Sequence, residues 1–347
     1  MSNGVFYAIA AAVLFGASTP LAKSLLDAVD PVLLSGLLYL GGGVGLVVVR
    51  VARDGGWKAS GLQPAEWRWL AGAIAFGGVL GPVALMQGLT MTAGATASLL
   101  LNLEAVLTAL IAWVVFRENA DRRVVMGMVS IVAGGVVLSW PQGGTTVEGS
   151  WLGPLSIAAA CLFWGIDNNL TRKVSSNDAL LIAGSKGLVA GVVNIAVALS
   201  MGAALPEAFV ITSAMTVGLL GYGVSLVLFV LALRGLGTAR TGAYFSVAPF
   251  VGALVSIVWL NESASQELWI AGALMAVGVW LHLSERHEHE HTHEPMEHEH
   301  THVHDEHHQH EHEFPWEAGK AHTHVHRHMV ITHKHPHFPD IHHRHGH

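Results

Sequence analysis

Long apolar segments separated by short polar connections occupy most of this chain. An apolar run of about 20 residues is long enough to cross the hydrocarbon core of a bilayer as a helix. Because lipid offers the backbone no hydrogen-bond partner, such segments must be helices rather than open strands. The pattern therefore predicts an all-α membrane protein with ten transmembrane helices, at residues 4–24, 31–51, 67–89, 94–116, 122–140, 151–172, 179–200, 212–233, 241–260 and 268–284.

The two halves of this apolar region resemble each other. LFGASTPLAK in the first segment (14–23) matches LFWGIDNNLTRK in the sixth (162–173), and residues 97–118 match 241–262, each ending in a Glu. Because a repeat of five helices has an odd number of spans, the second copy begins on the opposite side of the membrane from the first. We therefore predict two inverted five-helix repeats, residues 1–140 and 151–284, with a substrate path near the midplane where they meet.

Positive charge in the loops predicts the orientation. With the N-terminus on the inside, alternate loops place eleven Lys and Arg on the inner side and only Lys23 on the outer side. Positive residues are retained in the cytoplasm, so both termini are expected to be cytoplasmic, in a bacterial inner membrane. One missed helix would invert this pattern, so the charge count also supports ten spans.

Composition then separates a third region, residues 285–347. All 24 histidines lie from His282 onward. From His287 onward there are 4 basic and 11 acidic residues, so the tail accounts for the formal net charge of −7. Dense charge and few apolar residues predict a disordered tail. The single cysteine, Cys161, excludes an intramolecular disulfide.

Several motifs resemble the EamA-type permeases of the drug/metabolite transporter superfamily. They are the turn from Gly16 to Pro20, the Ala-Thr-Ala-Ser-Leu-Leu run at 95–100, and Pro249 with Glu262. The family usually has a proline where this chain has Ala105. The resemblance covers residues 4–284 and implies ten helices in two repeats, both termini inside, and transport of a small solute. The tail and the Asp-Asn-Asn-Leu-Thr-Arg-Lys stretch resemble a nickel/cobalt-resistance branch.

Three charged residues lie inside predicted helices away from the ends, toward the bilayer centre: Glu104, Asp167 and Lys186. Such residues cost at least about 2.5–3.5 kcal/mol to insert and usually face the bundle interior or a water-filled path. Asp167 and Glu104 are candidates for a cation or proton site, with Lys186 as partner; the alternative is a static buried ion pair. The candidate path residues are Asp167, Glu104, Lys186, Asn102, Asn168, Asn169 and Asn194.

Prolines inside predicted helices remove backbone hydrogen bonds. Pro20 and Pro249 occupy the first and ninth segments. They are candidate hinges for alternating access, and the other interpretation is a kink packed against neighbouring helices.

Histidine-rich tracts favour metal binding, since neutral imidazole suits zinc, nickel, cobalt and copper. A pH-sensing tail is the alternative. The predicted ligands are His287, His289, His291, His293, His298, His300, His302, His304, His307, His308, His310, His312, His322, His324, His326 and His328. No required cofactor is expected, only Ni, Co or Zn bound by the tail.

Together these features favour a secondary transporter that exports a divalent cation, nickel or cobalt, by proton antiport. The alternative is export of an organic metabolite or amino acid with the tail as a separate metal buffer. A membrane-anchored metal store would leave the intramembrane carboxylates without a use. The chain has no P-loop, so an ATP-driven pump is not expected, and it has no basic patch for nucleic acid. No histidine precedes His282, so the apolar region has no Ser/His or Cys/His pair, and an enzyme is not expected. The expected partners are the lipid bilayer, the solute and, as an option, a second copy of the chain in a homodimer.

Overall fold

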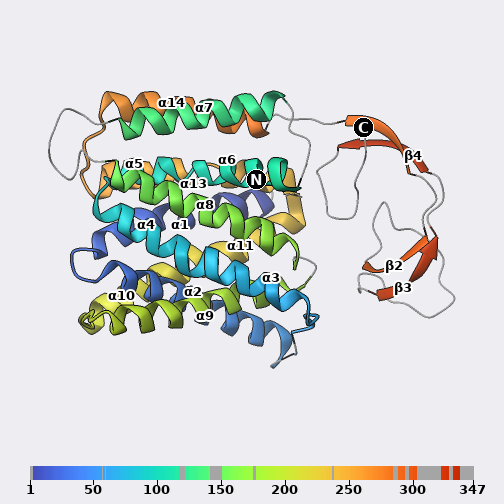
Figure 1. Cartoon of the computed structure of the whole chain (residues 1–347), viewed down its shortest axis with the longest axis horizontal. Coiled ribbons are helices and arrows are strands. Elements are labelled where there is room, and N and C mark those ends of the chain that lie inside the picture. Colours follow the sequence, from blue (N-terminus) through green and yellow to red (C-terminus); the bar gives the residue numbers. More distant parts are fainter. Residues whose placement is uncertain are drawn as a thin grey trace. The chain divides into compact units, whose positions relative to one another are not determined.

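The computed structural model describes residues 3–56, 58, 60–116, 122–140, 151–174, 177–236 and 238–283 and, in the tail, 288–293, 297–302, 322–327 and 331–336. The chain forms two compact units, residues 1–285 and 286–347. The first is a bundle of long helices lying side by side (Figure 1). Its helices are α1 (Asn3–Leu25), α2 (Pro31–Asp54), α3 (Glu66–Ala73), η1 (Ile74–Leu80), α4 (Gly81–Thr90), α5 (Gly94–Leu100), α6 (Leu103–Phe116), α7 (Arg122–Ser139), α8 (Leu152–Arg172), α9 (Ala179–Ser200), α10 (Ala208–Gly218), η3 (Leu219–Val224), α11 (Ser225–Leu236), α12 (Thr238–Phe245), α13 (Ala248–Trp259) and α14 (Gln266–Leu283).

Within the described part of the chain, nine helical segments are long and apolar enough to span a bilayer. Each overlaps one of the predicted segments, and α8, which corresponds to the sixth, is absent from the nine. Although α8 has 21 residues, Asp167, Asn168 and Asn169 lower its mean hydropathy. It lies among other helices of the bundle, against α4 and α6.

The second helix of each predicted repeat begins after an aspartate that caps its N-terminus. Asp30 precedes α2, and its carboxylate accepts hydrogen bonds from the N–H groups of Val32 (2.8 Å) and Leu33 (3.1 Å). Asp178 precedes α9 and accepts one from the N–H of Leu180 (3.0 Å). Both carboxylates satisfy amide groups that a helix start leaves without partners. The two helices then pack together closely (Figure 1).

Glycines allow this close packing of α2 against α9. A Cβ at Gly43 would overlap the backbone of Gly187, and one at Gly191 would come within 2.6 Å of the Leu40 amide nitrogen. Small residues let membrane helices approach until their backbones touch. Gly187 and Gly191 therefore serve helix packing.

The third helix of each half contains a π-helical segment. Residues Ile74–Leu80 form η1 between α3 and α4, and Leu219–Val224 form η3 between α10 and α11. Their first residues are 145 positions apart, which is the spacing of the sequence repeat. Segments of this kind are rare and frequently lie at functional sites.

The fourth helix of each half is interrupted. Helices α5 and α6 are separated by Leu101 and Asn102, and α12 and α13 by Ser246 and Val247. Pro249 lies in the first turn of α13, whereas its counterpart is Ala105. The interruption in the first half therefore needs no proline; there the Asn102 side-chain amide donates to the carbonyl of Leu99 (2.9 Å). Helix α1, by contrast, continues through Pro20.

The tail unit has two antiparallel pairs of strands. Strand β1 (Glu288–His293) pairs with β4 (Ile331–Pro336), and β2 (Glu297–His302) pairs with β3 (His322–Arg327). Disorder throughout residues 285–347 is therefore not confirmed for these four segments. Histidine alternates with other residues in these segments, and this alternation has the period of a β-strand. The prediction from sequence gave more weight to the density of charged residues, which favours disorder.

Candidate functional site

An ion pair lies inside the helix bundle, between α8 and α9. The ammonium nitrogen of Lys186 is 2.6 Å from both carboxylate oxygens of Asp167. The hydroxyl of Thr171, one turn beyond Asp167, donates to the same carboxylate (2.8 Å). The Asp167 side chain is 8% exposed and that of Lys186 16%. The structure therefore joins two of the three predicted intramembrane charges, with Lys186 as the partner of Asp167.

The third charge, Glu104, lies on α6 and faces the next residue of α8. The amide of Asn168 donates to the Glu104 carboxylate (2.9 Å) and lies 3.2 Å from the hydroxyl of Thr108. None of the ion pairs found among the described residues involves Glu104. Asp167 thus has a cationic partner, while the described partner of Glu104 is neutral.

The π-helical segment η1 forms one wall of this site. The Tyr39 hydroxyl (2.8 Å) and the Trp164 indole N–H (3.0 Å) both donate to the carbonyl of Gly77, and the Asn194 amide donates to that of Gly78 (3.2 Å). A π-helix alters the normal i to i−4 pattern, so its carbonyls are available to side chains. Side chains from α2, α8 and α9 therefore converge on one short stretch of backbone.

Gly77 is required by the position of Asp167. A Cβ at residue 77 would overlap the Asp167 carboxylate. In the other half, a Cβ at Gly221 of η3 would lie 2.5 Å from the Cβ of Ser18 on α1. Ser18 is 149 residues before Asp167, so each repeat packs its first helix against the π-helical segment of the other. The two halves share one arrangement, but only one copy carries a charge.

The remaining predicted path residues lie around this site or away from it. Asn169 donates to the carbonyl of Gly165 (2.8 Å) within α8, and Asn194 is fully buried beside η1. Asn102 lies instead between Leu99 and the sulfur of Met275 on α14. Whether any of these residues contacts a solute stays a prediction.

Sequence reasoning missed Tyr39 and Trp164, because neither is charged and both read as ordinary aromatic residues of a membrane helix. The adjacent glycines Gly77 and Gly78 were the available signal, although glycine is common throughout this chain, with 39 residues. Nothing in the sequence places a π-helical segment there. The convergence on Gly77 depends on tertiary packing.

A cavity of about 500 Å³ lies between α1 and the α10–η3 region. Small hydroxyl side chains mix with apolar ones in its lining. These hydroxyls are those of Ser18, Thr212, Ser213 and Thr216. The cavity therefore reaches the position on α1 that corresponds to Asp167 on α8.

A polar cluster joins helices at one end of the bundle. The ammonium of Lys23 donates to the carbonyls of Leu89 (2.9 Å) and Thr92 (2.8 Å). Glu262 accepts from the N–H groups of Gly94 (2.7 Å) and Ala95 (2.8 Å) at the start of α5. These contacts connect α1 and the segment after α13 to the junction of α4 and α5.

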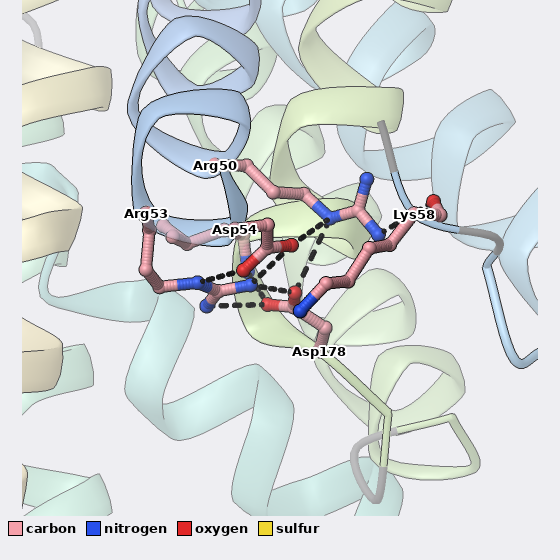
Figure 2. Close-up of polar contacts among 6 residues, drawn as sticks. Arg50, Arg53, Asp54, Lys58 and Asp178 are labelled. Carbon is pink, nitrogen blue, oxygen red and sulfur yellow. Dashed lines mark hydrogen bonds and ion pairs between the residues drawn. The ribbon is translucent and has the colours of Figure 1, made fainter. Parts of the chain in front are cut away.

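A second cluster lies between the end of α2 and the start of α9 (Figure 2). Arg50 is 4% exposed; its Nε is 3.2 Å from Asp178, and it also donates to the carbonyl of Lys58 (3.0 Å). Arg53 contacts both Asp54 (2.7 Å) and Asp178. Burial alone would raise the pKa of Asp178, but hydrogen bonds from Arg53, the Leu180 N–H and Arg50 outweigh it and lower the pKa.

Among the side chains that the structure describes, no group of three or more His, Cys, Asp or Glu residues could hold a metal ion. Of the predicted metal ligands, nine lie on the four strands: His289, His291, His293, His298, His300, His302, His322, His324 and His326. The others lie outside the described residues: His287, His304, His307, His308, His310, His312 and His328.

A bundle of apolar helices with two related halves and a polar site between them defines a multi-pass membrane transporter. The chain belongs to the EamA-like transporter family, which matches residues 2–140 and 151–284. The expected resemblance is thereby confirmed at the level of the family and its two repeats. Membership points to a transporter rather than an enzyme.

Two further similarities agree with this assignment. An uncharacterized transporter of Methanothermobacter thermautotrophicus is 28% identical over 294 residues, covering 80% of this chain and 85% of the relative. A solved crystal structure matches with a TM-score of 0.59 at 23% identity, covering 81% of this chain and 98% of that one. This second likeness supports the fold alone.

Proposed function

We propose that this transporter exports a divalent metal cation, nickel or cobalt, from the cytoplasm in exchange for protons. The observation that carries the proposal is Glu104, an intramembrane carboxyl group whose described partner is the neutral amide of Asn168. An ionised carboxylate in such a place is costly without a cation. Glu104 therefore holds either a proton or a transported cation, and exchange of one for the other couples the two fluxes.

The Asp167–Lys186 ion pair is a second part of the proposed site, and a bound cation can separate its two partners. Lys186 neutralises Asp167 when the site is empty. A divalent cation carries twice the charge of the ammonium and, once bound at Glu104, attracts the Asp167 carboxylate away from Lys186. Oxygen atoms of Glu104, Asp167, Asn168 and Thr108 suit a partly hydrated divalent ion.

The orientation assigned to this transporter follows from loop charge and places both termini in the cytoplasm. Helix α8 then serves as the tenth span, because Asp167 and Asn169 are buried among neighbouring helices and Asn168 donates to Glu104 of α6. The histidine-rich tail lies on the side from which metal is exported, where it gathers ions. A bacterial inner membrane is the location proposed.

A second candidate function is export of a small zwitterion such as an amino acid. The observation that favours it is the close pairing of an ammonium and a carboxylate beside two aromatic side chains, Tyr39 and Trp164. A zwitterionic solute could replace Lys186 at Asp167 and present its own carboxylate to Lys186. The tail would then be a metal buffer unrelated to the solute.

Transport in proteoliposomes separates these functions. Purified protein is reconstituted with a pH-sensitive dye inside, and Ni²⁺, Co²⁺, Zn²⁺ or an amino-acid mixture is added outside. Proton antiport predicts a metal-dependent pH change that Glu104→Gln abolishes, while the loop variant Glu207→Gln retains it. A pH change or uptake with amino acids alone would contradict metal export and support the second function.

A further inference from the structure

The break between α4 and α5 leaves two helix ends that this segment does not complete by itself. Helix α4 ends at Thr90, and α5 begins at Gly94. The last carbonyls of one helix and the first N–H groups of the next have no partner within their own helix. Ala93 precedes α5, and its side chain provides no capping hydrogen bond. The described partners of these groups come instead from distant parts of the chain.

Two side chains of opposite charge complete these ends. The Lys23 ammonium donates to the carbonyls of Leu89 (2.9 Å) and Thr92 (2.8 Å), at the end of α4. The Glu262 carboxylate accepts hydrogen bonds from the first two N–H groups of α5 (2.7 and 2.8 Å). A helix dipole is negative at its C-terminus and positive at its N-terminus, so each charge lies at the end that it stabilises. We call these two side chains, together with residues 89–95, the Lys23–Glu262 clamp.

The end of α13 brings Glu262 to this position. Asn261, directly before it, has a left-handed φ of 52°. Helices often end on such a residue, which is usually glycine and sometimes asparagine. The N–H of Glu262 then donates to the carbonyl of Ser256 (3.4 Å). Among the non-glycine residues that the structure describes, Asn261 is the one with positive φ. The chain therefore turns sharply at the point from which Glu262 reaches α5.

Small residues close the crossing of α5 and α13 beside the clamp. A Cβ at Gly94 of α5 would lie 2.7 Å from the hydroxyl oxygen of Ser256 on α13. In the same way, a Cβ at Gly252 of α13 would lie 2.7 Å from the hydroxyl oxygen of Ser98 on α5. Small residues at four-residue spacing let helices approach closely in a membrane. Because Ser98 is 1% and Ser256 0% exposed, little space remains between the two helices.

Helix α1 joins this closure. A Cβ at Gly16 of α1 would overlap the carbonyl oxygen of Ala248 on α13, and one at Gly252 would lie 2.8 Å from the carbonyl oxygen of Gly16. Further along α1, Lys23 reaches the clamp. Helices α1 and α5 belong to the first repeat and α13 to the second. The crossing and the clamp therefore hold the two halves of the transporter together at one end.

The corresponding region of the other half is not packed in this way. At the repeat spacing of 144 residues, Ser98 of α5 corresponds to Gly242 of α12. A Cβ at Gly242 would meet no atom within 4 Å, whereas Ser98 is buried against α13. Likewise, Leu100 is 1% exposed and its counterpart Tyr244 is 36% exposed. The two related helices, α5 and α12, therefore differ in packing although they occupy equivalent places in the repeats.

We propose that the Lys23–Glu262 clamp is a gate that holds one end of the transport path closed. In a transporter built from inverted repeats, the path opens to each side in turn as the halves move against each other. Glu262 belongs to one half and its N–H partners to the other, so opening this end breaks both hydrogen bonds. The described structure is the state closed at this end. The inference concerns transport itself and holds for either candidate solute.

The chemistry of the clamp suits a contact that breaks and forms again. Hydrogen bonds that involve a charged group are roughly twice as strong as neutral ones. Lys23 and Glu262 are only partly buried, so water can take over their hydrogen bonds when the helices separate. The clamp therefore favours the closed state without making it permanent. An apolar contact of the same size would carry no preference for one pairing of helix ends.

Distances between spin labels test this gate. Labels are attached at Thr90→Cys and Ser263→Cys in a Cys161→Ala background, using the full-length protein in lipid nanodiscs. Thr90 ends α4 and Ser263 follows Glu262, and both are exposed. The pair therefore reports the separation of the two sides of the clamp. The native protein is expected to show mainly one short distance.

Removal of the Glu262 carboxylate is expected to raise the population at longer distance. Loss of a helix cap corresponds to a change of about 5- to 30-fold in an equilibrium, and Glu262→Ala should increase this population by a factor in that range. Glu262→Gln keeps one carbonyl acceptor and is expected to have a smaller effect. Glu207→Ala is the matched control, because Glu207 precedes α10 without a side-chain cap hydrogen bond. Lys23→Met is expected to act in the same direction as Glu262→Ala.

A reference pair separates opening from loss of structure. Val129→Cys on α7 and Val277→Cys on α14 are exposed positions on two helices that pack together away from the clamp. Their distance is expected to stay the same in every variant. Identical distributions at the clamp in the native protein and in Glu262→Ala would overturn the gate. Equal broadening at both label pairs would also overturn it, because Glu262 would then support the fold in general.

Discussion

At the scale of single residues, three charged groups lie among the apolar helices of the bundle: Glu104, Asp167 and Lys186. Asp167 and Lys186 neutralise one another on neighbouring helices, while the carboxyl group of Glu104 has an amide partner. A buried ion pair contributes little net stability compared with apolar residues, but breaking it leaves an uncompensated charge. Its presence in a bundle that could be wholly apolar therefore supports a role in transport.

Single and double substitutions of this pair are expected to differ in stability. Lys186→Met or Asp167→Asn alone should destabilise the bundle, with Lys186→Met leaving a carboxylate uncompensated at a cost of about 3–5 kcal/mol. The double variant restores neutrality and should unfold at a higher temperature than Lys186→Met. Thermal unfolding in detergent measures this, and equal unfolding temperatures for these two variants would show that the residues are not coupled.

Asp178 predicts a pH dependence at the end of α2. Its pKa in the folded protein is lowered, so its contribution to stability is complete above the unfolded value of about 3.9. That contribution is lost as pH falls through the lower, folded pKa. The difference in unfolding temperature between the native protein and Asp178→Asn is therefore expected to be constant near neutral pH and to shrink in acid.

A matched control for Asp178 is Asp30, which caps α2 and whose described hydrogen bonds come from the N–H groups of Val32 and Leu33 rather than from an arginine. Asp30→Asn keeps a capping side chain and is expected to change stability less than Asp178→Asn at pH 7. A larger effect of the Asp30 variant would contradict the importance assigned to Arg50 and Arg53.

At the scale of elements, the π-helical segments distinguish these helices from simple membrane spans. In each half, a segment of this kind meets a polar residue of the first helix of the other half: η1 meets Asp167, and η3 meets Ser18. The same element thus recurs at corresponding places in the two repeats. The chemical difference between Asp167 and Ser18 makes one copy charged and leaves the other beside the cavity along α1.

Substitution of the π-segment glycine tests this contact. Gly77→Ala is expected to displace the Asp167 carboxylate and reduce transport strongly, because the added Cβ has no space. Gly242→Ala serves as control, since a Cβ there meets no atom within 4 Å. Transport rates in proteoliposomes, corrected for the amount of inserted protein, give the comparison. Equal rates in the two variants would show that the Asp167 position is not critical.

At the scale of the whole molecule, the proposed ten-span topology with two inverted repeats requires the loops to alternate between the two sides of the membrane. The loop before α10 and the chain terminus are then on opposite sides. Cys161 is the single cysteine of the sequence, so replacing it with alanine gives a background without cysteine. This makes the arrangement directly testable by labelling.

A cysteine at exposed Leu205 and one appended after His347 are expected to behave differently in intact cells. With Cys161→Ala as background, Leu205→Cys should react with an impermeant maleimide from outside, and the appended cysteine only after permeabilisation. Labelling is read by gel shift. Reaction of both in intact cells would contradict the cytoplasmic tail and the ten-span topology together.

Much of this architecture could be predicted from sequence because membrane burial acts locally. Every predicted segment coincides with helices of the structure to within a few residues, since a long apolar segment favours a helix in lipid. The exclusion of charge from lipid likewise made Glu104, Asp167 and Lys186 conspicuous. The aspartates before α2 and α9 are also readable, because a cap acts on the next three residues.

Other features depend on which helices meet. Lys186 pairs with Asp167, and Asn168 donates to Glu104, because segments far apart in the chain pack together. The same is true of Tyr39 and Trp164 meeting at Gly77.

In the tail, sequence determined the alternation of histidines, but charge density favoured disorder, and only the pairing of strands brought histidine opposite histidine. Local physics thus determined the spans and their polar residues by itself. Tertiary structure decided the partners, because contact energies depend on distances in space that the order of residues does not contain.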